Sequence, residues 1–178
     1  AALTGYGLEG PDRDRAAYDI AAFWARSGIA WSLTPAGGSP PFQRGGMGDH
    51  GAGMVLAGAV SAALFKRAQT GRGQLVSTSL LRQGLYTLSF DIAVALRMGV
   101  GLAQGSRETM NNPTTNNYLA KDGRRFWVVG LEADRHWPPL VRCIDRTDWL
   151  SDPRFATAAA RAQNARALIQ LLDEVFAT

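Results

Sequence analysis

The sequence predicts a helix-rich α/β protein built from two parts. Hydrophobic residues make up 46% and charged residues 19% of the 178-residue chain, a globular composition that excludes a disordered protein. Apolar residues recur at helical spacing over most of the chain, whereas alternating strand patterns are few and short. A polar, irregular stretch separates two better patterned regions. We therefore expect a first part over residues 1–98, a linker over 99–117 and a second part over 118–178.

The first part is expected to be mostly helical, after an irregular start over residues 1–15. Apolar spacing predicts three helices, over residues 16–31 with a break near Gly28, over 51–69 and over 80–98. A long Gly- and Pro-rich loop is expected over 34–49, and alternation predicts one strand over 74–79. Because a stable sheet needs several strands, the partners of this strand are expected to come from elsewhere.

The second part is expected to be α+β. The Lys-Asp-Gly-Arg turn at 121–124 lies between two apolar runs and predicts a β-hairpin from 118–120 and 125–131. Two helices are expected to follow, over 134–144 and 156–176, and Asp134 is placed to cap the first of them.

Composition excludes several classes of function. The net charge is +4, but the arginines are dispersed and form no recognition motif, so we expect no nucleic-acid partner. The most apolar run, residues 51–65, is shorter than the roughly 20 residues of a membrane-spanning helix, and no membrane partner is expected. The single cysteine, Cys143, is expected to be a buried structural thiol, and it fits a cytoplasmic protein. With only two histidines, no metal site is expected.

The segment Gly45–Gly53 is the best candidate for chemistry. It places Asp49 and His50 among five glycines directly before an apolar helix, and its sequence is GGMGDHGAG. Glycines let a ligand approach the backbone, and the N–H groups of a helix N-terminus favour anions. The competing interpretation is that Asp49 only caps the helix, which its residue type favours. Because adjacent helical residues do not share a face, a direct pair of Asp49 and His50 is not expected.

Several ordered blocks of the chain resemble family III CoA-transferases, the group that includes alpha-methylacyl-CoA racemase. The central block is GMGDHGAGMVLAGAVSAALFKRAQTGRGQLVSTSLL, with an aspartate before a small-residue helix and a TGRGQ turn. Upstream, GYGLEGPDRDRAAYD is similar to a second family block, and NNYLAKDGRRFWVVG and DWLSDPRFAT are similar to its small domain. The resemblance covers nearly the whole chain and implies part of the family's large domain followed by part of its α+β small domain.

The resemblance implies a reaction and residues to perform it. Asp49 matches the aspartate that attacks an acyl-CoA thioester and forms a mixed anhydride, after which CoA moves to a second carboxylic acid. Coenzyme A thioester is then a substrate, and no covalently bound cofactor is expected. Gly48, His50 and Gly51 beside Asp49 are expected to contact the substrate. Glu132 matches a small-domain position that faces the site and is a further expected contact.

Tyr18 distinguishes the two activities of the family. It occupies the position at which the racemases carry the histidine that works with the aspartate as acid and base. A phenol is a poor base at neutral pH but can donate a hydrogen bond to a thioester or carboxylate oxygen. Tyr18 is therefore a predicted catalytic residue of a transferase, and a racemase-like isomerase is the alternative.

Family members are roughly twice as long as this chain and form interlocked dimers. We therefore expect the chain to be an internal piece of such an enzyme, and we expect a homodimer or other self-association. A fragment without activity of its own, which only binds or self-associates, is a third alternative.

Overall fold

The computed structural model describes residues 1–101 and 106–178. The chain forms two compact units, Ala1–Gln104 and Gly105–Thr178, and the boundary falls among the residues that are not described. Each unit has a buried core of its own, and each is described separately.

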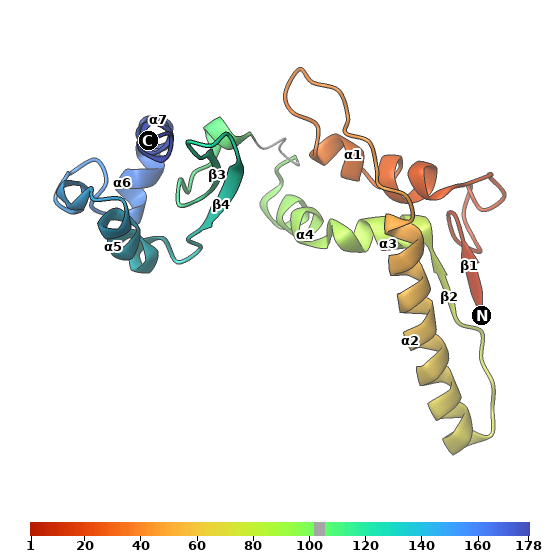
Figure 1. Ribbon diagram of the computed structural model, residues 1–178. Coiled ribbons are helices and arrows are strands. Elements are labelled where there is room, and N and C mark those ends of the chain that lie inside the picture. The colour runs from red at the N-terminus through yellow and green to blue at the C-terminus, as the bar shows by residue number, and fades with distance from the viewer. Residues whose placement is uncertain (102–105) are drawn as a thin grey trace. The chain divides into compact units, whose positions relative to one another are not determined.

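Unit 1 contains a short parallel sheet. Strand β1 (Ala2–Thr4) pairs with β2 (Ser77–Ser79), and Leu3 lies opposite Thr78 (Figure 1). The prediction that residues 1–15 are irregular was therefore wrong at β1, and β2 has one partner within this chain, although its partners were expected to come from elsewhere. Three residues are too few to give a recognisable alternation, so β1 is identifiable only through its pairing.

The other elements of unit 1 are all helices, and three of their predicted boundaries were wrong, the first being that of the helix predicted from residue 16, which begins at Ile20. The elements are the π-helix η1 (Ile20–Ala25), α1 (Ile29–Ser32), α2 (Met47–Thr70), α3 (Leu80–Thr87) and α4 (Ser89–Met98). Helix α2 begins four residues before its predicted start, inside the glycine-rich segment. The helix predicted over 80–98 is interrupted at Leu88, which ends α3 and precedes α4.

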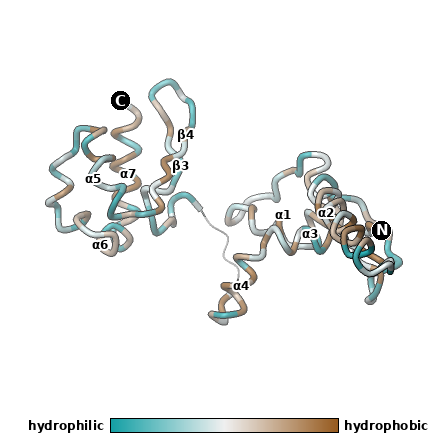
Figure 2. The backbone as a smooth tube through the Cα atoms, turned by 90° about the horizontal axis from the view of Figure 1, so that it is seen from below, coloured by the Kyte–Doolittle hydropathy of each residue, from teal (hydrophilic) through white to brown (hydrophobic). Residues whose placement is uncertain are grey.

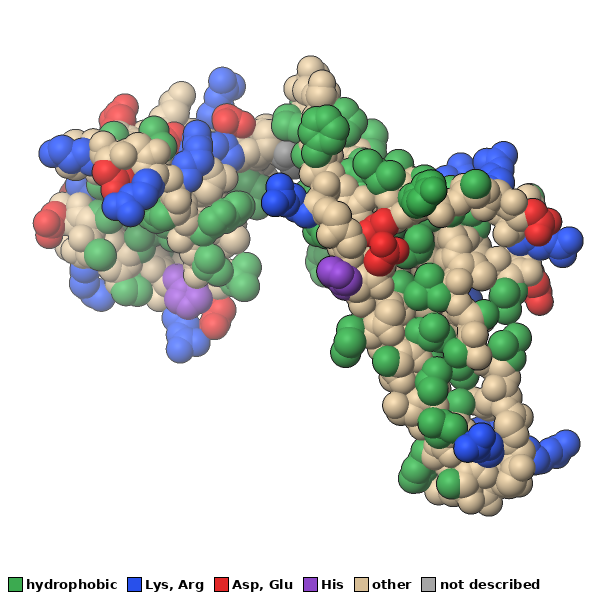
Figure 3. All heavy atoms as spheres, turned by 45° about the vertical axis from the view of Figure 1, so that its right-hand side comes forward, with side chains coloured by type: hydrophobic (Ala, Val, Ile, Leu, Met, Phe, Trp, Pro, Cys, Tyr) green, Lys and Arg blue, Asp and Glu red, His purple; other side chains and the backbone are tan. Residues whose placement is uncertain are grey.

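The core of unit 1 lies where η1 meets α2 and α3. Its buried side chains are Ala22, Phe23, Trp24, Ile29, Ala52, Leu80 and Leu88. Beyond this core, apolar side chains are exposed along α2 and α4. The backbone tube has many hydrophobic positions along both helices (Figure 2), and the space-filling view shows many apolar side chains at the surface (Figure 3). Phe65 of α2 is 68% exposed and Leu96 of α4 is 82% exposed. Within the described residues, these faces have no packing partner.

Unit 2 packs a β-hairpin against helices. Its elements are η2 (Arg107–Thr109), β3 (Thr115–Leu119), β4 (Arg125–Val129), α5 (Ala133–Cys143), η3 (Thr147–Leu150), α6 (Ala158–Gln163) and α7 (Ala165–Phe176). The predicted hairpin is confirmed, with β3 and β4 antiparallel and Tyr118 opposite Phe126. The buried core contains Tyr118, Trp137, Val141, Trp149, Phe155, Leu168, Ile169 and Leu172.

Four details of unit 2 differ from expectation. Residues 106–117 are not a linker, because η2 and the beginning of β3 lie there and Arg107 forms an ion pair with Asp173 of α7 at 2.5 Å. Asn164 divides the helix predicted over 156–176. Cys143 is exposed. Asp134 does not cap its own helix and instead accepts hydrogen bonds from the N–H of Ala158 and the buried guanidinium of Arg161.

No helix in the described part of the chain is long and apolar enough to cross a membrane.

Candidate active site

The candidate site is built on the first turn of α2. Gly46 precedes the helix with a φ of 78°, a left-handed conformation that glycine adopts without strain and other residues rarely do. The first helical residue is Met47, so Asp49 lies in the first turn. A negative side chain is favoured at this end by the helix dipole. The turn therefore fixes the backbone of Asp49 at the positive end of a 24-residue helix.

The N–H groups at the N-terminus of α2 donate their hydrogen bonds to a residue outside the helix, Asp19. Both carboxylate oxygens of Asp19 accept from the N–H of Gly48, at 3.1 and 3.0 Å, and one accepts from the N–H of Asp49 at 3.3 Å. The interpretation of Asp49 as a simple cap is therefore unnecessary, because Asp19 performs that function. The expectation that these amide groups are free to bind an anion was wrong, since Asp19 occupies both.

Gly48 lets η1 and α2 come close together. It is buried, and a Cβ atom at this position would overlap Asp19 Oδ1 and the side chain of Phe23. Phe23 belongs to η1, which directly follows Asp19. The structure thus gives Gly48 a packing role. Its predicted contact with substrate stays a prediction.

The two predicted catalytic side chains, Asp49 and Tyr18, are both exposed. Tyr18 is 81% exposed and directly precedes Asp19, whose carboxylate binds the amide of Asp49. Asp19 thus connects the two residues, because it follows Tyr18 in the chain and its carboxylate accepts a hydrogen bond from the Asp49 N–H. Among the residues that the structure describes, nothing donates a hydrogen bond to the Asp49 carboxylate, which leaves its oxygens available to react.

His50 and Gly51 lie beside Asp49 but face different neighbours. The imidazole of His50 lies against Gly46, where a Cβ atom would be 3.0 Å from its Cε1. At Gly51 a Cβ atom would be 2.9 Å from Nε2 of Gln83 in α3. Both glycines therefore allow close packing, and the contacts of His50 and Gly51 with substrate stay predictions.

Glu132 belongs to unit 2. It precedes α5, and its carboxylate forms an exposed ion pair with Arg135 at 3.1 Å. The structure describes this residue separately from Asp49, so its predicted place beside the substrate stays a prediction. Within the described ranges, no group of three or more His, Cys, Asp or Glu side chains is arranged to hold a metal ion.

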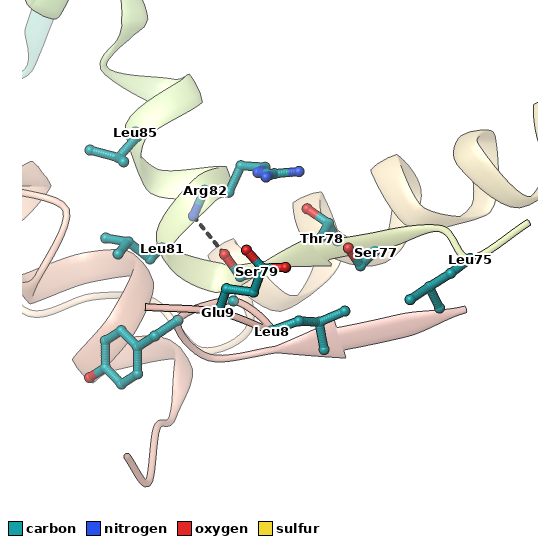
Figure 4. Close-up of a pocket in the computed structure, with 11 residues that line it drawn as sticks. Leu8, Glu9, Leu75, Ser77, Thr78, Ser79, Leu81, Arg82 and Leu85 are labelled. Carbon is teal, nitrogen blue, oxygen red and sulfur yellow. Dashed lines mark hydrogen bonds between the residues drawn. The ribbon is translucent and has the colours of Figure 1, made fainter. Parts of the chain in front are cut away.

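Unit 1 also contains a cavity of about 540 Å³ between β2, α3 and the segment after β1 (Figure 4). Leucine side chains and the charged Glu9 and Arg82 line it, and the N–H of Arg82 donates to Oγ of Ser79 at 3.1 Å. Neither Asp49 nor Tyr18 is among the lining residues. We place the candidate chemistry at Asp49 because its carboxylate lies on the first turn of a helix, whereas the carboxylate of the cavity, Glu9, lies outside any helix or strand.

Comparison with known proteins decides the family. Residues 1–178 match the sequence profile of CoA-transferase family III over their whole length. The chain belongs to CoA-transferase family III. It is 33% identical over 174 residues to the (R)-2-hydroxy-4-methylpentanoate CoA-transferase of Clostridioides difficile, and this match covers 98% of the chain and 43% of that relative. It is 35% identical over 156 residues to the cinnamoyl-CoA:phenyllactate CoA-transferase of Clostridium sporogenes, covering 87% of the chain and 38% of that relative.

Solved structures agree with membership of family III. A CaiB/BaiF family protein from Brucella suis superposes with a TM-score of 0.78 at 27% identity, covering 99% of this chain and 46% of that one. Rv3272 from Mycobacterium tuberculosis shares the fold with a TM-score of 0.82. The helix-rich α/β fold predicted from the sequence is confirmed. The chain spans less than half the length of these family III relatives.

Sequence reasoning did not find Asp19 as part of this site. The residue directly follows Tyr18, but it lies 29 positions before Gly48, and no local spacing rule connects the two. The available signal was the glycine at 48 in the first turn of a helix, because a missing side chain there indicates that another group approaches closely.

Proposed function

We propose that this chain carries the nucleophile of a CoA-transferase, and that the nucleophile is Asp49. The observation that carries the proposal is the exposed Asp49 carboxylate, which has no hydrogen-bond donor among the described residues and is held on the first turn of α2. Carboxylates act as covalent nucleophiles when they are positioned against an electrophile.

The reaction proceeds through two mixed anhydrides of Asp49, with an Asp49 CoA thioester between them. An Asp49 oxygen attacks the thioester carbonyl of the donor, the C–S bond breaks, and a mixed anhydride and CoA thiolate result. The thiolate then attacks the Asp49 carbonyl of the anhydride, which releases the donor acid and leaves Asp49 as a CoA thioester. The acceptor carboxylate attacks this thioester, its C–S bond breaks, and a second mixed anhydride and CoA thiolate form. The thiolate attacks the acceptor carbonyl of this anhydride, so that a new acyl-CoA leaves and Asp49 is a free carboxylate again.

Tyr18 stabilises the charged states of this route. Each attack places negative charge on a carbonyl oxygen, and a donor aimed at that oxygen lowers the barrier. The phenol of Tyr18 is exposed next to Asp19 and can donate without first losing a proton. This is the reason to favour transfer over racemisation, because racemisation needs a base on one face of the substrate α-carbon to remove the proton and an acid on the other face to return it.

Two carboxylic acids and one CoA group are the proposed substrates. Two family III relatives are an (R)-2-hydroxy-4-methylpentanoate CoA-transferase and a cinnamoyl-CoA:phenyllactate CoA-transferase, and both of these acids are 2-hydroxy acids. We infer acyl-CoA and a carboxylic acid of this kind for the present chain, with His50, Gly51 and Glu132 as substrate contacts. A homodimer in the cytoplasm completes the proposal, supported by the uncovered apolar faces of α2 and α4.

The test measures formation of a new acyl-CoA by mass spectrometry when the protein is mixed with cinnamoyl-CoA and a panel of 2-hydroxy acids. Asp49→Asn is expected to abolish transfer, and Asp91→Ala, an exposed aspartate in the first turn of α4, is the matched control. Hydroxylamine is expected to convert the Asp49 intermediate to a hydroxamate in the wild-type protein only. Transfer that survives in Asp49→Asn would overturn the assignment. Exchange of the substrate α-proton in deuterated water without CoA transfer would favour the racemase.

A further inference from the structure

We propose that Asp19 is a positioning residue for Asp49, an inference that rests on the proposed function. Asp19 binds two consecutive amides at the beginning of α2, those of Gly48 and of Asp49 itself. A hydrogen bond to the amide of the reacting residue fixes the origin of its side chain. Asp19 thereby determines where the Asp49 carboxylate lies relative to a bound thioester.

The position of Asp19 is itself fixed by the core. Directly after it, η1 buries Ala22, Phe23 and Trp24. The indole N–H of Trp24 donates to the carbonyl oxygen of Pro41 at 3.2 Å, which ties η1 to the loop before α2. A π-helix is rare, and such turns are frequent at functional sites. The Asp19 carboxylate is therefore presented from a well-packed element rather than from a mobile loop.

Two glycines hold this element against its neighbours. On one side, Gly48 allows Asp19 and Phe23 to lie directly over α2. On the other side, a Cβ atom at Gly84 of α3 would be 2.7 Å from the carbonyl oxygen of Phe23, so α3 also packs at close range. The separation between Asp19 and the α2 amides thus depends on the absence of a side chain at Gly48. A substitution at Gly48 tests this without changing Asp19.

Occupation of these amides has a chemical consequence. The N–H groups of Gly48 and Asp49 point at the Asp19 carboxylate, so they are not the donors that stabilise the oxyanion formed when Asp49 attacks. That task falls to Tyr18, the residue before Asp19. Asp19 therefore positions the nucleophile, and the adjacent Tyr18 stabilises the negative charge that develops on the oxyanion.

The test separates geometry from charge with two conservative variants. Asp19→Asn keeps an oxygen acceptor at the same reach and removes the charge, whereas Asp19→Glu keeps the charge and moves it one methylene away. Positioning predicts that Asp19→Asn retains kcat within about fivefold, and that Asp19→Glu and Asp19→Ala lose about 10- to 100-fold with KM nearly unchanged. Asp91→Ala, in the first turn of α4, is the control for the loss of an aspartate from unit 1.

Amide hydrogen exchange gives a readout that needs no activity. The N–H groups of Gly48 and Asp49 are expected to exchange about tenfold faster in Asp19→Ala than in wild type and to stay protected in Asp19→Asn. Two results would overturn the proposal. One is unchanged amide exchange in Asp19→Ala. The other is an Asp19→Asn protein whose amides are protected but whose kcat is as low as that of Asp19→Ala. If the wild-type protein transfers no CoA, the proposed function fails, and the exchange data still decide whether Asp19 holds the turn.

Discussion

Gly48 and Phe23 lie so close that a single methyl group at Gly48 would overlap the Phe23 side chain. The contact joins η1 to the first turn of α2, and the Asp19 carboxylate lies in the same contact. We expect Gly48→Ala to destabilise unit 1 by about 2–3 kcal/mol, because the methyl group forces packed neighbours apart. Urea unfolding measures this cost.

The matched control for that substitution is Gly53→Ala. Gly53 lies in the same helix, and a Cβ atom there would meet nothing within 4 Å. Alanine is favoured over glycine inside a helix by about 0.5–1 kcal/mol, so this variant is expected to be slightly more stable than wild type. Equal effects of the two substitutions would contradict the close-contact explanation.

Tyr18 can be changed without disturbing the core, because its side chain is 81% exposed. We expect Tyr18→Phe to fold normally and to lose about 100- to 1,000-fold in kcat, the range typical of removing one hydrogen-bond donor from a developing oxyanion. Circular dichroism checks the fold and steady-state kinetics the rate. A fully active Tyr18→Phe protein would remove the phenol from the mechanism.

Tyr18→His tests the boundary between the two activities of the family. An imidazole titrates near neutral pH and can remove a proton, which a phenol does poorly there. The variant is expected to gain α-proton exchange of an acyl-CoA in deuterated water, measured by NMR. If no exchange appears, residue 18 alone does not decide between transferase and racemase chemistry.

Arg161 of unit 2 is a buried cation with one carboxylate partner. Its side chain is 2% exposed, donates to Asp134 and to the carbonyl oxygen of Phe155 at 2.6 and 2.7 Å, and lies over the Trp137 ring. Asp134→Ala leaves this charge without its carboxylate and is expected to cost about 2–3 kcal/mol, less than in a fully buried pair because Asp134 is exposed. Arg135→Ala, which breaks the exposed ion pair with Glu132, is expected to lower the free energy of unfolding by less than about 1 kcal/mol. Thermal unfolding of both variants measures the two costs.

Tyr118 gives unit 2 a pH dependence. Its ring is fully buried and its hydroxyl donates to the carbonyl oxygen of Pro113 at 2.6 Å, and burial raises the pKa of the phenol well above its usual value. The folded protein therefore holds this proton more tightly than the unfolded chain does. The resulting stability is fully present below about pH 10, the pKa of an unfolded tyrosine, and is lost as the pH rises above it.

An absorbance titration at alkaline pH tests this directly. Tyr118 is expected to ionise only when unit 2 unfolds, because its buried hydroxyl has a raised pKa. Tyr118→Phe should remove this step from the titration. Ionisation of Tyr118 before unfolding would show that its phenol is not protected.

Local patterns predicted the fold where structure is decided locally. The Lys-Asp-Gly turn specified the hairpin of unit 2, and Gly123 in that turn has a φ of 80°. Local patterns failed where a distant residue decides. The glycines at 45–48 argued against helix, yet α2 begins at Met47, where Asp19 binds the amides of the first turn.

The sequence likewise indicated only those residues of the candidate site that lie in a recognisable local block. Asp49 and Tyr18 could be proposed from the sequence because each occupies a position in a block similar to the family's, and their catalytic roles stay predictions. Asp19 could not, because its role depends on contact with Gly48 across 29 positions. The apolar stripe over 80–98 was also real, but it did not reveal the interruption at Leu88, which separates α3 from α4.

The pairing of β1 with β2 bears on how unit 1 folds. Ala2 and Ser77 are partners although about 75 residues separate them, and every helix before β2 lies in the intervening chain. Closing so long a loop lowers the conformational entropy of the chain, and the hydrogen bonds of a three-residue strand pair are too few to offset this cost alone. We therefore expect the strand pair to form after η1 and α2 have docked rather than to nucleate folding. Refolding of unit 1 is accordingly expected to be slower than that of the hairpin-based unit 2, whose strands are near neighbours in sequence.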